Sequence, residues 1–319
     1  MFTKLPDLLG RNFIIGYLLP SFALIVSIYL LDEQYNFLPA NIDLTFVSQL
    51  GALEQVTVLG LLALLGGIIL LIFNRNMIKF LEGYGQFNPL GLFAWIEKSR
   101  FKKLEGEIDE IEKEYIAYFE KDKTVPLEIK EKYRQLKQKR VVRFPDDERW
   151  LLPTSFGNIL RAFETYSRVM YGADAIPIWT RLLAVIPDDY RQFIDTAKTL
   201  VDFWVNTLVV SLVVLVVYLG NVIYFQQIKL LWLPIACLIV AFITYQQAGR
   251  SAMGWGNFVK AAFDLFLEDL KQQLAISNET SDLRQDAKIW LKFSQAIHFV
   301  APESLPEKHI KQKQDNSSS

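Results

Sequence analysis

The chain has 319 residues, of which 51% are hydrophobic and 22% are charged. Its net charge of −1 provides no general electrostatic attraction for nucleic acid, so no nucleic-acid partner is expected. The single cysteine, Cys237, excludes a disulfide framework and a CxxC metal site, and the two histidines, His298 and His309, are too few for a histidine-based metal centre. No metal and no cofactor are therefore expected. This composition is typical of membrane spans joined to one polar domain.

Four apolar segments have the length of a membrane-spanning helix, which needs about 20 residues to cross the hydrocarbon core. They contain no Asp, Glu, Lys or Arg, and they are Asn12–Leu31, Val56–Phe73, Phe203–Phe225 and Leu230–Ala248. Short connections join them in two pairs, which predicts two transmembrane hairpins. No small-residue cleavage site follows the first segment, so it is interpreted as a span and not as a signal peptide. We expect Pro20 and Pro234 to kink the first and fourth spans.

The distribution of Lys and Arg predicts the orientation of these spans. The loop Asp32–Gln55 contains no basic residue, and the loop Gln226–Lys229 contains one. The other 33 of the 34 basic residues lie elsewhere, and five of them flank the spans closely: Lys4, Arg11, Arg75, Lys79 and Arg250. Because basic segments remain in the cytoplasm, we expect both termini and residues 74–202 and 249–319 to lie on the cytoplasmic side.

A helical hairpin is predicted at residues 96–145. Its first helix has apolar residues at the 3,4 spacing of a coiled-coil seam, and these are Phe101, Leu104, Ile108, Ile111, Tyr115 and Tyr118. The returning helix continues the pattern with Ile129, Tyr133 and Leu136. Because the seam is shorter than three heptads, it is interpreted as a hairpin inside one subunit that serves as a structural spacer.

The returning helix ends in a cluster of basic residues, Lys137, Lys139, Arg140 and Arg143. Two interpretations remain open for this cluster. It could rest on anionic lipid headgroups, where each basic residue contributes roughly 1 kcal/mol, or it could be the solvated end of a helix.

Residues 152–190 form the amphipathic core of the predicted cytoplasmic domain. Pro153–Ser155 starts a helix, residues 171–174 end it, and a shorter helix follows. The segment supplies a mixed polar and aromatic group, which consists of Asn158, Arg161, Glu164, Tyr171, Asp174, Trp179 and Arg181. Two arginines beside an amide and an aromatic ring could bind a phosphate or a nucleotide. The same residues could equally form a salt-bridge network that stabilises the domain, and both readings remain open.

Two long helices are expected to leave the membrane. No glycine or proline interrupts the chain between Pro187 and Leu219, so a stalk and the third span can form one helix. The fourth span is followed by an amphipathic stretch, although Gly249, Gly254 and Gly256 are expected to kink its start. A final helix is expected at Asp282–Phe299. The predicted organisation is a first hairpin at 1–80, a cytoplasmic domain at 81–200, a second hairpin at 201–249, amphipathic helices at 250–300 and a disordered tail at 301–319.

Several segments together resemble a group of uncharacterised bacterial four-span membrane proteins. They are LGRNFIIGYLLP at the first span, PTSFGNILRAFETY and YGADAIPIWTRLLAVIP in the middle, and GNFVKAAFDLFLEDL after the fourth span. The resemblance covers both ends and the centre, and it implies a bacterial plasma-membrane location. It implies no activity.

The sequence contains no Walker loop, GxGxxG, HExxH, GxSxG or CxxC motif in a suitable context. The spans have few polar residues, chiefly Asn206, Thr207 and Ser211, which are interpreted as interhelical hydrogen-bonding groups. An all-α membrane protein that acts as a non-enzymatic scaffold, sensor or effector is the resulting hypothesis. An oligomeric pore is the alternative, and a membrane-tethered enzyme or nucleotide-binding protein that uses the Arg161/Arg181 group is a weaker one. The expected partners are the lipid bilayer, further copies of the chain and a cytoplasmic protein.

Overall fold

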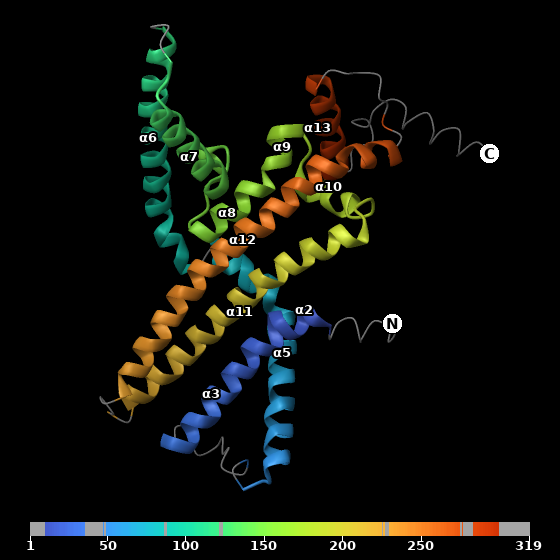
Figure 1. The fold of residues 1–319 in the computed structure, drawn as a ribbon. Coiled ribbons are helices and arrows are strands. Elements are labelled where there is room, and N and C mark those ends of the chain that lie inside the picture. Colours follow the sequence, from blue (N-terminus) through green and yellow to red (C-terminus); the bar gives the residue numbers. More distant parts are fainter. Residues whose placement is uncertain are drawn as a thin grey trace, which may run out of the picture. The chain divides into compact units, whose positions relative to one another are not determined.

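The structure is a computed structural model that describes residues 10–35, 47, 49–85, 88–120, 124–224, 226, 230–274, 276 and 283–299. Every element in these residues is a helix, as the sequence predicts (Figure 1). The tail at 301–319, half of the expected outer loop Asp32–Gln55 and most of the loop Gln226–Lys229 lie outside the described residues. The chain divides into two compact units, Met1–Phe80 with Asp195–Ala252, and Leu81–Ile194 with Met253–Ser319.

The first unit contains the four apolar segments, and each forms a helix that is long and apolar enough to cross a membrane. The first segment comprises α2 (Arg11–Phe13), η2 (Ile14–Leu18) and α3 (Leu19–Tyr35). The other three lie in α5 (Ala52–Glu82), α11 (Asp188–Tyr224) and α12 (Trp232–Gln273). Most large apolar side chains of α5 and α12 are exposed, as expected of helices that face lipid.

Pro20 shapes the first of these helices. Proline has no backbone N–H, so it cannot donate the usual helical hydrogen bond to the carbonyl four residues earlier, which is that of Gly16. The turn that precedes Pro20 is a π-helix, Ile14–Leu18, and the Gly16 carbonyl accepts a hydrogen bond from Asn206 Nδ2 of α11 at 2.8 Å. Because of the proline, the Gly16 carbonyl accepts a hydrogen bond from another helix, α11, in place of one from its own helix. Pro234, by contrast, lies in the first turn of α12, where its missing N–H costs nothing.

Small residues bring α5 close to the first helix. Ala63 is fully buried, and a Cβ at Gly67 would lie 3.2 Å from the ring of Phe13. A Cβ at Gly66 would clash with the hydroxyl oxygen of Ser21 at 2.2 Å. Glycine at these two positions thus allows close packing, which is the usual way in which membrane helices associate. The unit has a core that consists of Phe13, Tyr17, Leu70, Val210, Val214 and Tyr218.

Helices α11 and α12 each contribute residues to both units. α11 has 37 residues and α12 has 42, and neither is broken along its length (Figure 1). The uninterrupted α11 agrees with the lack of glycine and proline between Asp188 and Leu219. The kink expected at Gly249–Gly256 is not seen as a break in α12. Gly256 instead allows Phe163 to approach the helix, because a Cβ there would lie 2.5 Å from the Phe163 ring.

The second unit begins with a helical hairpin. After the short η3 (Pro89–Phe93), α6 (Ala94–Glu120) and α7 (Leu127–Arg143) pack together around Phe101, Leu104, Ile108 and Phe144. Tyr115 and Tyr133 stack across the pair with ring centroids 5.4 Å apart. The predicted seam residues therefore form the contact between the two helices.

The remaining helices of this unit are short. They are η4 (Glu148–Trp150), α8 (Ser155–Glu164), α9 (Tyr166–Tyr171), α10 (Ala175–Leu182) and α13 (Leu283–Phe299). The Thr154 hydroxyl accepts a hydrogen bond from the Gly157 backbone N–H at 2.9 Å, so Thr154 caps the start of α8. Gly172 ends α9 in the left-handed conformation with φ of 71°, where glycine is favoured.

Aromatic side chains hold α12 against its neighbours within this unit. Phe163 of α8 packs edge-to-face on Trp255 at 5.1 Å, and Trp179 of α10 lies 5.9 Å from Phe263. The Tyr190 hydroxyl of α11 donates to the Phe258 carbonyl at 3.1 Å. The amphipathic face predicted after the fourth span is therefore covered by aromatic contacts from three other helices.

Two glycines on helices provide a matched test of this packing. A Cβ at Gly157 would lie 2.6 Å from the Glu82 carbonyl oxygen, whereas a Cβ at Gly106 of α6 would meet nothing within 4 Å. We expect Gly157→Ala to lower the free energy of unfolding by about 1–3 kcal/mol. Gly106→Ala should raise it by up to about 1 kcal/mol, because alanine restricts the unfolded chain. Thermal unfolding of the purified protein checks both, and equal effects of the two substitutions would contradict the packing described.

Candidate functional site

The seven residues predicted from 152–190 lie in the second unit, where the structure separates them into several contacts. Asn158 is fully buried, and its amide bonds both the N–H and the C=O of Leu152, at 2.7 and 2.9 Å. It also donates to the buried carboxylate of Glu97 at 3.2 Å, which accepts a further bond from the Ser155 hydroxyl. The Asn158 side chain thereby fixes the chain that enters α8, and none of its polar atoms is free to hold a ligand.

Arg161 lies among aromatic rings. Its guanidinium donates to the Tyr84 hydroxyl and lies 5.8 Å from the centroid of that ring and 5.7 Å from the Trp150 ring. The Arg168 guanidinium lies 5.5 Å from the same Trp150 ring. Cations attract the face of an aromatic ring, so Trp150 partly offsets the repulsion between the two arginines.

Glu164 and Asp174 supply negative charge near Arg161. The Arg161 Nε lies 3.7 Å from the Glu164 carboxylate. Burial raises the pKa of Glu164 above its ordinary value, Arg161 opposes that shift, and Asp174 adds to it. Asp174 also caps α10, because its side chain accepts from the Ile176 N–H at 3.3 Å. Glu164 and Asp174 therefore each make a structural contact, which is one of the two readings that the sequence left open.

Tyr171 belongs to a different contact. Its hydroxyl donates to Asp264 of α12 at 2.7 Å, and the hydroxyl of Tyr166 donates to the same carboxylate at 2.9 Å. Burial and the hydrogen bond to Asp264 raise the pKa of both tyrosines above the ordinary value. The two phenols therefore remain protonated at neutral pH and act as donors that join α9 to α12.

Trp179 and Arg181 do not join the Arg161 contacts. Trp179 packs on Phe263, and Arg181 donates to the Pro177 carbonyl at 2.6 Å, one turn earlier in the same helix. The structure thus brings together only Arg161, Glu164 and Asp174 from the predicted group. It adds Tyr84, Trp150 and Arg168 to them. Trp150 and Arg168 are exposed, whereas the Arg161 side chain is only 15% exposed, so Arg168 and the indole are the groups here that an anionic partner could reach.

The residues of the predicted basic cluster on α7 also make different contacts from one another. Arg140 forms an ion pair with Glu105 and donates to the carbonyls of Pro145 and Asp146, each at 2.7 Å. Its guanidinium also lies 4.7 Å from the Phe101 ring, so Arg140 holds the base of the hairpin together. Lys137 pairs with Glu112 at 3.1 Å. Lys139 and Arg143 are exposed and have no ion pair among the described residues.

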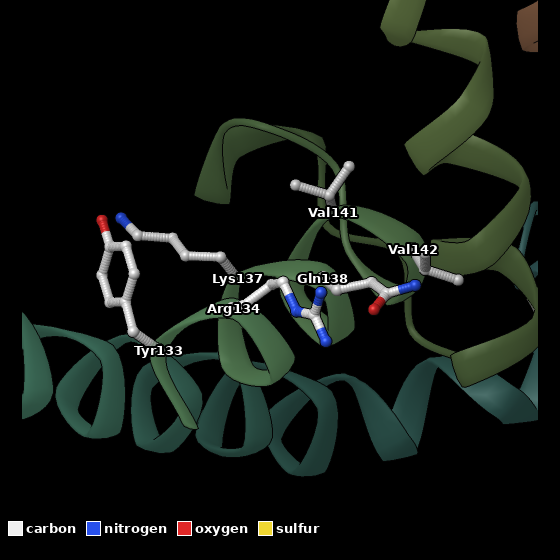
Figure 2. A pocket seen from close by; sticks show the side chains of 6 residues that line it. All are labelled: Tyr133, Arg134, Lys137, Gln138, Val141 and Val142. Atoms are coloured by element: carbon white, nitrogen blue, oxygen red, sulfur yellow. The ribbon is translucent and has the colours of Figure 1, made fainter. Parts of the chain in front are cut away.

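A shallow hollow of about 540 Å³ lies beside this cluster (Figure 2). Figure 2 shows that its lining side chains all project from α7, and these are Tyr133, Arg134, Lys137, Gln138, Val141 and Val142. Because one helix supplies every lining residue, polar groups from different elements do not converge on it as they do in most ligand sites.

A buried ionic contact of the first unit was not predicted from the sequence. Asp202 of α11 accepts hydrogen bonds from the Tyr17 hydroxyl at 2.8 Å, from Asn74 Nδ2 at 2.9 Å and from the Lys198 ammonium at 2.8 Å. Asp202, Tyr17 and Asn74 are all buried. Three apolar helices therefore meet at one carboxylate, which we call the Asp202 clamp, defined by Tyr17, Asn74, Lys198 and Asp202.

The sequence signal for this clamp is weak, because its members are distant from one another in the chain. Asp202 and Asn74 each stand one residue outside an apolar run, where polar residues are ordinary. Asn206, one turn after Asp202, was interpreted as an interhelical hydrogen-bonding group, and it bonds the Gly16 carbonyl. Thr207 and Ser211 instead donate to carbonyls of their own helix, those of Phe203 and Thr207, each at 2.7 Å.

No group of three or more His, Cys, Asp or Glu side chains that could hold a metal ion occurs in the part of the chain that the structure describes. No protein-family model, no curated protein and no solved structure matches this chain. The fold therefore defines the class: the described residues form only helices, and four of these helices are long and apolar enough to cross a membrane.

Replacement of Asp202 tests the clamp. Asp202→Ala leaves the Lys198 ammonium and the Asn74 amide without their common acceptor. We expect it to lower the free energy of unfolding by about 2–4 kcal/mol, below the usual cost of breaking a fully buried pair because Lys198 is partly exposed. Asp195→Asn, at an exposed position of the same helix, should change it by less than about 0.5 kcal/mol. Thermal unfolding in detergent measures both, and similar losses would refute a special role for Asp202.

Proposed function

We propose that this protein is a non-enzymatic membrane sensor or effector, in which a change in the membrane unit alters a helical unit outside the membrane. The observation that carries the proposal is the continuity of α11 and α12, each of which contributes an unbroken helix to both units. An unbroken helix resists bending, so a shift or rotation at one end is felt at the other.

Each unit holds these helices by specific contacts. In the first unit the Asp202 clamp ties α11 to the first span and to α5. In the second unit Tyr190 of α11 bonds the Phe258 carbonyl of α12 and packs against Phe266 at 5.2 Å. A change that loosens the clamp would release α11 in the membrane, and the Tyr190 contacts would carry the movement to α12.

The surface formed by Trp150, Arg161 and Arg168 is the proposed contact for a partner of the helical unit. It carries two guanidinium groups and two aromatic rings, and Trp150 is 40% exposed and Tyr84 is 42% exposed. Aromatic and arginine side chains dominate the binding energy of protein interfaces. An acidic segment of a cytoplasmic protein is the partner that this surface would accept.

For the cellular setting, we propose the inner membrane of a bacterium, with both termini and the helical unit in the cytoplasm. The support is the basic residues that flank the spans, Arg11, Arg75, Lys79 and Arg250, against outer loops that contain one lysine in total. The resemblance to four-span bacterial proteins supports the same setting.

The transmission between units is testable by hydrogen exchange of the full chain in lipid nanodiscs. We expect Asp202→Asn to increase amide exchange in the first unit and also at residues 188–194 and 253–270 of the second. Asp195→Asn serves as the matched control and should leave both units unchanged. Two glycines inserted after Ile194 and two after Ala252 interrupt both helices, and in that background the effect should be confined to the spans. Increased exchange that is confined to the spans in the uninterrupted protein would contradict the proposal.

The orientation is testable by cysteine labelling in a Cys237→Ser background. A cysteine placed at Asn41 should react with a membrane-impermeant maleimide in intact cells, because the positive-inside rule places that loop outside. A cysteine placed at Lys123 should react only after the membrane is opened. Labelling at Lys123 in intact cells would overturn the orientation.

A further inference from the structure

One face of α5 carries an unbroken stripe of exposed side chains that changes from apolar to basic. Its members are spaced by 3, 4, 3 and 4 residues, so they lie on one side of the helix. Leu65, Ile68 and Ile72 are 58%, 37% and 66% exposed, and the exposed Arg75 and Lys79 follow them. We call these five residues the α5 stripe.

The opposite face of α5 fixes the direction of the stripe. Ala63 and Leu70 are buried, Gly67 lies against Phe13, and the Asn74 amide bonds Asp202. The helix is therefore held against the rest of its unit by the other face. The α5 stripe points away from these contacts.

The two cations of the stripe have no neutralising ion pair in the part of the chain that the structure describes. Neither Arg75 nor Lys79 forms an ion pair with any carboxylate among the described residues. They are four residues apart and hence about 6 Å from each other along one face. That spacing lets both reach the oxygens of one phosphate group, to which arginine can donate two parallel hydrogen bonds.

We infer that the α5 stripe is a binding site for an anionic phospholipid, whose phosphate lies between Arg75 and Lys79 and whose acyl chain follows Ile72, Ile68 and Leu65. From Arg75 to Leu65 the helix rises about 15 Å, which is half the thickness of the hydrocarbon core and hence the depth of one leaflet. The apolar and the charged parts of the lipid thus match the two parts of the stripe in order and in length.

Two other occupants fit the stripe less well. Membrane helices associate through small residues, whereas this face presents two isoleucines and a leucine. A second copy that packed the same faces in parallel would also bring Arg75 and Lys79 against like charges. An acidic protein segment could pair with the cations, but it would leave Leu65 and Ile68 uncovered. The inference is independent of the proposed sensing role, because it concerns only one exposed face of α5.

The test uses the full-length protein purified in a neutral detergent. Native mass spectrometry would count the phosphatidylglycerol and phosphatidylcholine molecules that remain bound to the wild type, to Arg75→Gln/Lys79→Gln and to Lys130→Gln/Arg134→Gln. The last pair is the matched control, because it removes two exposed, unpaired cations with the same spacing from α7. We expect the α5 variant to retain phosphatidylglycerol about 30-fold more weakly, since each cation contributes roughly 1 kcal/mol to binding an anionic lipid. Phosphatidylcholine binding should be unchanged.

Three further measurements separate the remaining outcomes. The exchange Arg75→Lys/Lys79→Arg keeps both charges and should retain the lipid, which separates charge from any fault in folding. Glycerol phosphate should not raise the thermal midpoint as phosphatidylglycerol does, and an equal rise would overturn a lipid as the ligand. Equal losses in the α5 and α7 variants, or no loss in either, would also overturn the site. So would a change in oligomeric mass on Arg75→Gln/Lys79→Gln, because it would assign the stripe to a second copy.

Discussion

Inside the hydrocarbon core no water can satisfy a free backbone carbonyl, and the fold of the membrane unit depends on how this constraint is met at Gly16. Pro20 deprives that carbonyl of its helical donor, and the Asn206 side chain of α11 replaces it. This hydrogen bond sets the position of the first membrane helix against α11. Asp202 lies one turn before Asn206 on α11, where it accepts hydrogen bonds from Tyr17 and Asn74. The Asp202 clamp and the Asn206–Gly16 hydrogen bond therefore both join α11 to the first membrane helix.

This arrangement explains why a carboxylate is tolerated at the edge of an apolar unit. A buried charge is costly unless it is paired and hydrogen-bonded, and Asp202 has a phenol, an amide and an ammonium as donors. The Lys198 side chain supplies the compensating charge while remaining 39% exposed, because its long apolar stem lets the ammonium reach the polar boundary. The clamp is therefore a polar contact at the edge of the spans, where partial access to water lowers the cost of the charge.

The segments that form helices could be predicted from the sequence because helix formation depends on local features. The apolar runs, the 3,4 seam of α6 and the lack of glycine or proline between Asp188 and Leu219 each act over a few residues, and the corresponding helices are present. The candidate group at 152–190 was only partly predictable, because Tyr84 and Trp150, which surround Arg161, come from other segments. Arg140 illustrates the same limit. Its charge left open a contact with lipid headgroups or a solvated helix end, whereas its three-dimensional neighbours, Glu105 and Phe101, hold it at the base of the hairpin.

Thr154 joins two distant parts of the chain through one hydroxyl group, which accepts from the Gly157 N–H at the start of α8 and donates to the Leu81 carbonyl at the end of α5 at 2.6 Å. The end of one helix and the beginning of another are thus completed by the same atom, between residues that are 73 positions apart in the chain. During synthesis the ribosome must make the whole α6–α7 hairpin before this atom exists. The Leu81 carbonyl at the end of α5 can therefore receive this bond only after the hairpin and the start of α8 have been made.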